Sequence, residues 1–152
     1  MSNITNNSLF EQIRNLIEQT KNNVAISVNS SLTMMYWEIG NRINQNILKN
    51  QRAEYGKEIV VTLSRQLQDN FGKGFDEKNL RRMMQFANAI EKQKVVTLSR
   101  QLSWSHFLAL LPLQESLKIE FYAQMSIVQN WGVRTLRERI DSMLYERTAL
   151  SK

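Results

Sequence analysis

Hydrophobic residues recur at steps of three and four along most of the chain, a spacing that predicts amphipathic helices. The first such stretch covers residues 8–48 and contains no proline and a single glycine. Its weakest point is residues 29–31, because the short side chains of asparagine and serine compete with the helix for backbone hydrogen bonds. We therefore predict a helical arm over residues 8–50, either one long helix or two nearly collinear helices.

The start of this arm carries a signal of its own. Ser8 is followed three residues later by Glu11, the pattern of a capping box at a helix N-terminus. Residues 1–7 precede this signal and are almost all polar, so we predict a disordered lead-in there. The apolar seam from Leu9 to Ile47 resembles that of a coiled coil and is longer than a small domain can easily cover. The seam predicts a homo-oligomer, most simply a dimer.

An octamer that occurs twice organises the middle of the chain. The letters VVTLSRQL stand at residues 60–67 and again at residues 95–102. Two copies are too few for a solenoid, which needs at least about three stacked repeats. In each copy a valine and two leucines fall at i, i+3 and i+7, so we predict a helix with one apolar face. We interpret the copies as the first helices of two helix-turn-helix-like units, residues 55–92 and 93–112.

The segments after the two copies differ. After the first copy, two glycines within residues 71–75 end the helix, and Asp76 is a favourable N-cap for the next one. After the second copy, Ser103 can cap a short and almost wholly apolar helix over residues 104–111, which Pro112 ends. The helix that begins after Asp76 is expected to bury Leu80, Met83, Met84, Ala87 and Ile90.

Residues 113–147 are predicted to form two C-terminal helices. The first should run from about residue 115 to residue 129 and turn inward Leu117, Phe121, Met125 and Val128. We find no convincing pair of strands in the sequence. The predicted fold is therefore all-α, with a single domain over residues 8–152 that contains the arm, the two units and the C-terminal helices.

The chain has a formal net charge of +6 and a sequence pI near 9.8, which suits a polyanionic partner such as nucleic acid. It contains no cysteine and one histidine, His106, so thiolate sites and histidine clusters are excluded and we expect neither a metal nor a cofactor. The sequence shows no signal peptide and no apolar window of about 18 residues. We expect a cytoplasmic protein that does not enter the membrane.

Cationic and amide side chains gather on the predicted helix after Asp76, on the side away from its apolar stripe. Arginine and the side-chain amides can pair with guanine and adenine edges, and a helix N-terminus favours phosphate. This is the composition expected of a DNA-reading helix, although an ordinary solvated helix face has the same composition. The candidate DNA contacts are Lys73, Lys78, Asn79, Arg81, Arg82 and Gln85, with Arg65 and Arg100 as further phosphate contacts.

The triplet Asp76-Glu77-Lys78 has the D-x-K spacing of PD-(D/E)xK nucleases, which need clustered carboxylates to hold a metal ion. No Pro-Asp pair precedes the triplet, and the triplet falls at a predicted helix start rather than on a strand. The chain also lacks a P-loop and a Rossmann glycine pattern. We therefore assign no catalytic residue and expect no enzyme activity from this chain.

Five runs of the sequence are similar to one known family: YGKEIVVTLSRQL (residues 55–67), GFDEKNLRRMMQF (74–86), LSRQLSWSHFLALLPL (98–113), EFYAQM (120–125) and DSMLYERTALSK (141–152). These runs resemble the N-terminal domain of the YhcG family, bacterial proteins with a C-terminal PD-(D/E)xK nuclease domain. The resemblance covers nearly the whole chain from about Leu9. It implies that the domain binds DNA and that the nuclease chemistry lies beyond the equivalent of Lys152. The chain would then be an excised domain, a truncated gene product or a member without the nuclease part.

Two functions are compatible with these observations. The first is a non-catalytic DNA-binding or target-recognition module of a PD-(D/E)xK nuclease, with DNA and the nuclease domain of full-length relatives as partners. The alternative is an oligomerisation or protein-interaction module of the parent nuclease that makes no direct contact with DNA. The cationic helix favours the first function, and the long apolar seam favours the second.

Overall fold

The computed structural model describes residues 2–22, 28–50 and 53–150, and every regular element in these ranges is helical, which confirms the all-α prediction. The elements are α1 (Ser2–Asn22), α2 (Val28–Asn50), α3 (Ala53–Phe71), the 3₁₀ turn η1 (Lys73–Phe75), α4 (Glu77–Ala89), α5 (Lys92–Leu98), α6 (Trp104–Leu110), the 3₁₀ turn η2 (Leu111–Leu113), α7 (Ser116–Val128), α8 (Val133–Asp141) and α9 (Leu144–Leu150).

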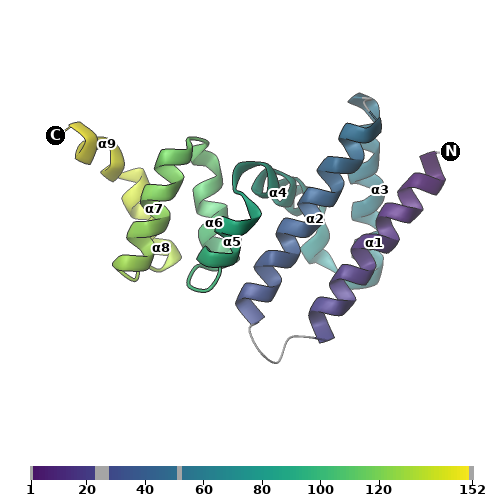
Figure 1. Cartoon of the computed structure of the whole chain (residues 1–152). Coiled ribbons are helices and arrows are strands. Elements are labelled where there is room, and N and C mark those ends of the chain that lie inside the picture. The colour runs from purple at the N-terminus through teal and green to yellow at the C-terminus, as the bar shows by residue number, and fades with distance from the viewer. Residues whose placement is uncertain (1, 23–27, 51–52, 151–152) are drawn as a thin grey trace.

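The helices form an elongated row, with α1, α2 and α3 at one end, α5 to α9 at the other, and α4 between them (Figure 1). Helices α1 and α2 run antiparallel side by side, so the prediction of a long or nearly collinear arm is wrong. The predicted weak point, residues 29–31, lies inside α2. Helix α1 begins at Ser2, ahead of the start predicted at Ser8, and residues 2–7 of the predicted lead-in are helical, whereas Met1 lies outside the described residues.

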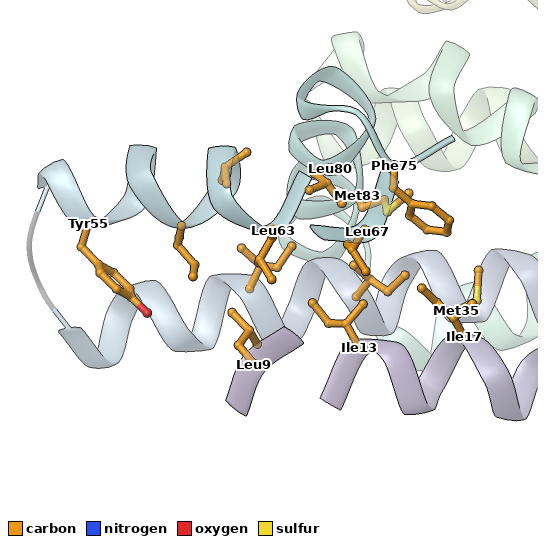
Figure 2. Close-up of a cluster of buried hydrophobic side chains, with 14 residues drawn as sticks. Leu9, Ile13, Ile17, Met35, Tyr55, Leu63, Leu67, Phe75, Leu80 and Met83 are labelled. Carbon is orange, nitrogen blue, oxygen red and sulfur yellow. The ribbon is translucent and has the colours of Figure 1, made fainter. Parts of the chain in front are cut away.

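The first hydrophobic core fills the space between α1, α2, α3 and the start of α4. Figure 2 shows Leu9 and Ile13 of α1 pointing toward Leu63 and Leu67 of α3, and Met35 of α2 beside Ile17 of α1. The apolar seam that predicted a dimer is therefore buried inside one chain, because the hairpin of α1 and α2 folds onto α3. The buried members of the seam are Leu9, Ile13, Ile17, Met35, Ile39 and Ile43.

The second core lies between α4 and the C-terminal helices. Phe86 and Phe107 meet at its centre, with their ring centroids 4.9 Å apart. Helix α4 contributes to both cores, with Met83 in the first and Phe86 in the second. Trp37 of α2 also enters the second core, where its indole Nε1 donates a hydrogen bond of 2.8 Å to the carbonyl of Ile90. The two cores are thus joined through α2 and α4, each of which has buried residues in both.

Helix α2 crosses α4 at Gly40, where the two backbones approach closely. A Cβ atom placed on Gly40 would lie 1.9 Å from the carbonyl oxygen of Met83, a separation that real atoms do not adopt. One turn further along α2, the Asn44 side chain donates a hydrogen bond of 2.9 Å to the carbonyl of Met84. Glycine is therefore required at position 40 by packing, and Asn44 fixes the register of the crossing.

Replacing Gly40 by alanine should lower the free energy of unfolding by about 3 kcal/mol, because α2 and α4 must separate to accommodate the methyl group. Gly56 is a matched control, since it is also helical but its added Cβ would meet only Ile47, at 3.6 Å. Gly56→Ala should raise stability by about 0.5 kcal/mol. Urea denaturation measures both values, and an equal effect of the two substitutions would contradict the close crossing.

Candidate nucleic-acid interface

The candidate interface begins at the turn between α3 and α4. Gly72 ends α3 in the left-handed region, with a φ of 96° that glycine adopts readily, and Phe75 of the following 3₁₀ turn is buried. Asp76 is the N-cap of α4, and its side chain accepts a hydrogen bond of 2.8 Å from the backbone N–H of Asn79. The glycine ending and the aspartate cap predicted from the sequence are confirmed.

The cationic side of α4 lies opposite its buried side. Lys78, Arg81 and Gln85 are exposed and Arg82 is half-buried, whereas the buried positions of the helix are Leu80, Met83 and Phe86. The Arg81 guanidinium has one acidic neighbour, Glu77, at 4.0 Å, and both side chains are about half exposed. An exposed pair at this distance contributes little to stability, so Arg81 can exchange it for a phosphate contact.

Two of the predicted contacts already have partners inside the chain. The Asn79 side chain is partly buried and donates a hydrogen bond of 3.2 Å to the carbonyl of Gly74, so it holds the turn that precedes α4. The Gln85 side chain donates a long hydrogen bond of 3.4 Å to the carbonyl of Leu111 in η2. Of the predicted residues, Lys73, Lys78 and Arg81 are the ones that combine a positive charge with clear exposure around the start of α4.

The buried stripe of α4 differs from the prediction at three positions. Phe86 is fully buried, whereas the predicted Met84 and Ala87 are half-buried. The reason is that α4 is packed on two sides, against α2 and against the C-terminal helices, so its buried face is wider than a single stripe. The exposed face that remains is correspondingly narrow.

The two identical octamers adopt different conformations. The first copy lies wholly within α3, whereas in the second copy the helix ends at Leu98 and residues 99–101 form a turn. The prediction of a helix for the second copy is therefore correct only for its first half. The residue that follows each octamer accounts for the difference. Ser103, directly after the second copy, caps α6 through a capping box with His106, whereas Gln68, directly after the first copy, continues α3.

Helix α2 stabilises the turn in the second copy. The Asn29 side chain donates hydrogen bonds of 3.0 Å to the carbonyls of both Ser99 and Leu102, which have left the regular helix. Despite this change, the same three apolar positions are buried in both copies, since a helix and a helix followed by a turn both direct them inward. The buried residues are Val60, Leu63, Leu67, Val95, Leu98 and Leu102.

The predicted phosphate contacts of the octamers lie apart from α4 in the chain. Arg65 is exposed in the second half of α3, and Arg100 is exposed in the turn that Asn29 binds. The structure therefore distributes the predicted residues over α3, the start of α4 and the turn after α5. Sequence periodicity indicated that both arginines point outward, but it contained no information on their distance from α4.

Helix α6, which comes after the second octamer, is part of the core, as predicted. Phe107 is fully buried, and Trp104 is half-buried with its ring 5.0 Å from that of Phe86. His106 has a structural role, because its Nδ1 accepts a hydrogen bond of 3.1 Å from the Ser103 backbone N–H and its Nε2 lies 2.9 Å from the Trp131 carbonyl. With Nδ1 as the acceptor, Nε2 carries the proton and donates to that carbonyl.

Helix α8 is a second cationic helix, which the sequence pattern did not indicate as a candidate site. Arg134, Arg137 and Arg139 are exposed on α8. Arg134 lies 3.6 Å from Glu138, and the Arg139 guanidinium lies 5.7 Å from the centre of the Trp131 ring. The signal that could have identified α8 is its density of arginines, three among the nine residues of a short helix.

Two features are absent from the part of the chain that the structure describes. Among the described residues, no three His, Cys, Asp or Glu side chains are grouped so that they could hold a metal ion. The helices within the described ranges also include none that is long and apolar enough to cross a membrane. Asp76 and Glu77 of the D-x-K triplet act at the start of α4, as a cap and as the partner of Arg81.

Comparison with known proteins assigns the chain to a family. The DUF1016 N-terminal domain matches residues 12–147. The chain belongs to this family. It is also 27% identical over 174 residues to the protein named "Putative nuclease YhcG" of Escherichia coli (strain K12), which confirms the resemblance to the YhcG family. The match covers 94% of the chain and 46% of that protein, so this DUF1016 domain spans about half the length of its curated relative. No solved structure matches the chain.

The cap of α6 in this DUF1016 domain provides a test of why the second octamer ends in a turn. Ser103→Ala removes the side-chain acceptor of the capping box and should lower the free energy of unfolding by about 1 kcal/mol. Ser105→Ala, two residues further on at an exposed position, should change it by less than about 0.5 kcal/mol. Chemical denaturation compares the two variants, and equal losses would rule out the cap as the cause.

Proposed function

We propose that this DUF1016 domain is a DNA-binding, target-recognition module of a nuclease and does not itself cut DNA. The observation that carries the proposal is the exposed cationic face of α4, where Lys78 and Arg81 lie opposite the buried side of the helix. The net charge of +6 supports it, because cationic surfaces attract the phosphate backbone. The name of the relative, which describes a nuclease, is consistent with a nucleic-acid context.

The packing of α4 suits a helix that contacts DNA. Both cores hold the helix, through Met83 on one side and Phe86 on the other, so its outward side chains start from a fixed backbone. The cap from Asp76 and the preceding 3₁₀ turn place Lys73 and Lys78 at the helix N-terminus, where backbone N–H groups also attract phosphate. Lysines and arginines in this arrangement neutralise phosphates, and a planar guanidinium can additionally pair with a guanine edge.

The proposal predicts the effect of removing two charges from α4. Arg81→Ala combined with Arg82→Ala should weaken DNA binding and flatten the slope of log affinity against log salt by about 2 if both side chains contact phosphates. If either side chain reads a base, its loss should cost about 1–3 kcal/mol and relax sequence preference. Fluorescence anisotropy with duplex, branched and single-stranded DNA across a salt series measures these changes. The same mixtures should show no cleavage with added magnesium or manganese.

The matched control is Arg14→Ala, which removes an exposed arginine from α1. This variant should leave the salt slope unchanged, and all the arginine variants should melt within a few degrees of the wild type. Phe107→Ala should instead destabilise the fold by about 3–5 kcal/mol, because its ring is fully buried. Unchanged DNA binding in the Arg81 and Arg82 variant, or cleavage that depends on Asp76, would contradict the proposal.

Self-association is a second candidate function, and a specific feature of α7 favours it. Leu117 and Val128 were predicted to point inward but are 68% and 71% exposed, whereas Ile119, Tyr122 and Ala123 are buried. Leu117 and Val128, together with the half-buried Phe121 and Met125, form an apolar stripe along the outer side of the helix, here named the α7 stripe. Apolar residues exposed along a whole helix are typical of an interaction surface.

The α7 stripe fits a second copy of the same chain. Its apolar positions are spaced almost evenly about the helix centre, so two antiparallel α7 helices would bring Leu117 of one copy against Val128 of the other. Beside the stripe lies a groove of about 440 Å³ between α5 and α7, with Leu98 and Ala123 among its lining residues. Lys94 at the groove is paired with Glu120, and this hydrogen bond raises the pKa of Lys94. The paired charges limit repulsion between two copies.

We expect the chain to form a dimer that depends on the α7 stripe. Leu117→Gln with Val128→Gln should convert the dimer to a monomer without unfolding it, because both side chains are exposed. Leu48→Gln is the control, since Leu48 is 72% exposed at the far end of α2. Light scattering at high micromolar concentration measures the mass. A monomeric wild type, or a monomeric Leu48 variant, would remove this candidate.

A further inference from the structure

A polar groove lies between α1 and α2, apart from the cationic face of α4. Its volume is about 380 Å³, which falls at the lower end of the range for small-ligand sites. Seven of its eight lining residues are polar, and a second small groove adjoins it across Gln12 and Arg42, which line both. The polar lining residues are Gln12, Glu38, Asn41, Arg42, Gln45, Asn46 and Lys49.

Arg42 is the unusual member of this groove. Its side chain is half-buried, and its Nη1 donates a hydrogen bond of 3.3 Å to the Gln12 side-chain oxygen on α1. Its Nε is shielded from solvent and has no acceptor. Glu38, the acidic residue one turn before Arg42, is bonded instead to Lys92 at 2.7 Å. Among the described residues, no carboxylate lies within ion-pair distance of Arg42.

Arg42 lacks the carboxylate partner that a partly buried arginine usually has. A guanidinium removed from water is normally paired with a carboxylate, because transfer of an unpaired charge to the protein interior is costly. Lys49, which lines the same groove, is exposed and also has no ion-pair partner among the described residues. Glu38 lines the groove as well, but its carboxylate is bonded to Lys92. Arg42 and Lys49 therefore have no acidic partner within the groove, and a bound anion would provide one.

We propose that this groove binds a phosphorylated small molecule of nucleotide size. Arg42 and Lys49 would bind the phosphate, for which arginine offers two parallel N–H donors and lysine a mobile charge. The amides of Gln12, Asn41 and Gln45 provide donors and acceptors together, the combination that pairs with a base or sugar edge. A free carboxylate would use the two cations but would leave these amides without partners.

Titration of the whole chain with dAMP, with inorganic phosphate and with acetate tests this inference. Backbone amide NMR shifts and the melting temperature serve as readouts. We expect dAMP to bind more tightly than phosphate, to shift signals of α1 and α2 and to raise the melting temperature, while acetate does neither. Absence of dAMP binding at millimolar concentration, or equal affinity for dAMP and phosphate, would overturn a nucleotide-sized site.

Substitutions in the groove test whether it is the binding site. Arg42→Gln should weaken dAMP binding by about tenfold or more, as expected for loss of a charged hydrogen bond. Gln45→Leu, at an exposed position that the fold does not need, should also weaken it. Arg14→Gln removes the same charge from the outer side of α1 and should leave the affinity unchanged. Affinity that survives both groove substitutions would overturn the assignment.

The site on α1 and α2 is separate from the proposed DNA contacts on α4. The Arg81 and Arg82 double variant should bind dAMP as the wild type does, and Arg42→Gln should keep the salt dependence of duplex binding. Failure of either proposal therefore leaves the other standing. Loss of dAMP binding in the Arg81 and Arg82 variant would overturn the proposed groove and place the phosphate contact on α4.

Discussion

The contact between Gly40 and the backbone of Met83 is the constraint on which the rest of the domain depends. Helices α2 and α4 each carry buried side chains into both hydrophobic cores, so their crossing joins the two ends of the molecule. Trp37 donates a hydrogen bond to the carbonyl of Ile90, just after the end of α4, and Asn44 donates one to the carbonyl of Met84 within α4. Because no Cβ separates the backbones, the helices cannot slide or rotate against each other without losing contacts in both cores. The cationic face of α4 is thereby held in one orientation.

Features encoded within a few neighbouring residues could be predicted from the sequence. The end of α3 at Gly72, the cap of α4 by Asp76 and the cap of α6 by Ser103 each depend on a local backbone requirement. The outward position of Lys78 and Arg81 could be inferred from helical spacing, because α4 has a clear apolar side. These local signals correctly indicated that Lys78 and Arg81 are exposed, although they did not reveal that Asn79 and Gln85 already have partners.

Features decided by tertiary contacts could not be predicted in this way. Helix α7 is apolar on more than one side, so spacing alone could not choose between burying Leu117 and burying Tyr122. The neighbouring helices make the choice, because they bury Tyr122 in the second core, where its hydroxyl accepts a hydrogen bond of 2.9 Å from the Tyr145 backbone N–H of α9. The octamers show the same limit most clearly, since eight identical residues form a helix in one place and a helix followed by a turn in another. The conformation of each copy is determined by the segment that comes after it and by the helix that packs on it.

Helix α2 presents two different surfaces from neighbouring turns. Gly40 and Asn44, four residues apart, face α4, whereas Arg42 between them faces α1 through Gln12. The side of α2 that holds the cationic helix is thus distinct from the side that lines the polar groove. A ligand in the groove would contact α1 and α2 but not α4. DNA would contact the exposed face of α4, whose other side packs against α2 at Gly40. The two proposed sites can therefore be occupied together, because the helix between them is fixed by its backbone and not by the side chains that either ligand would contact.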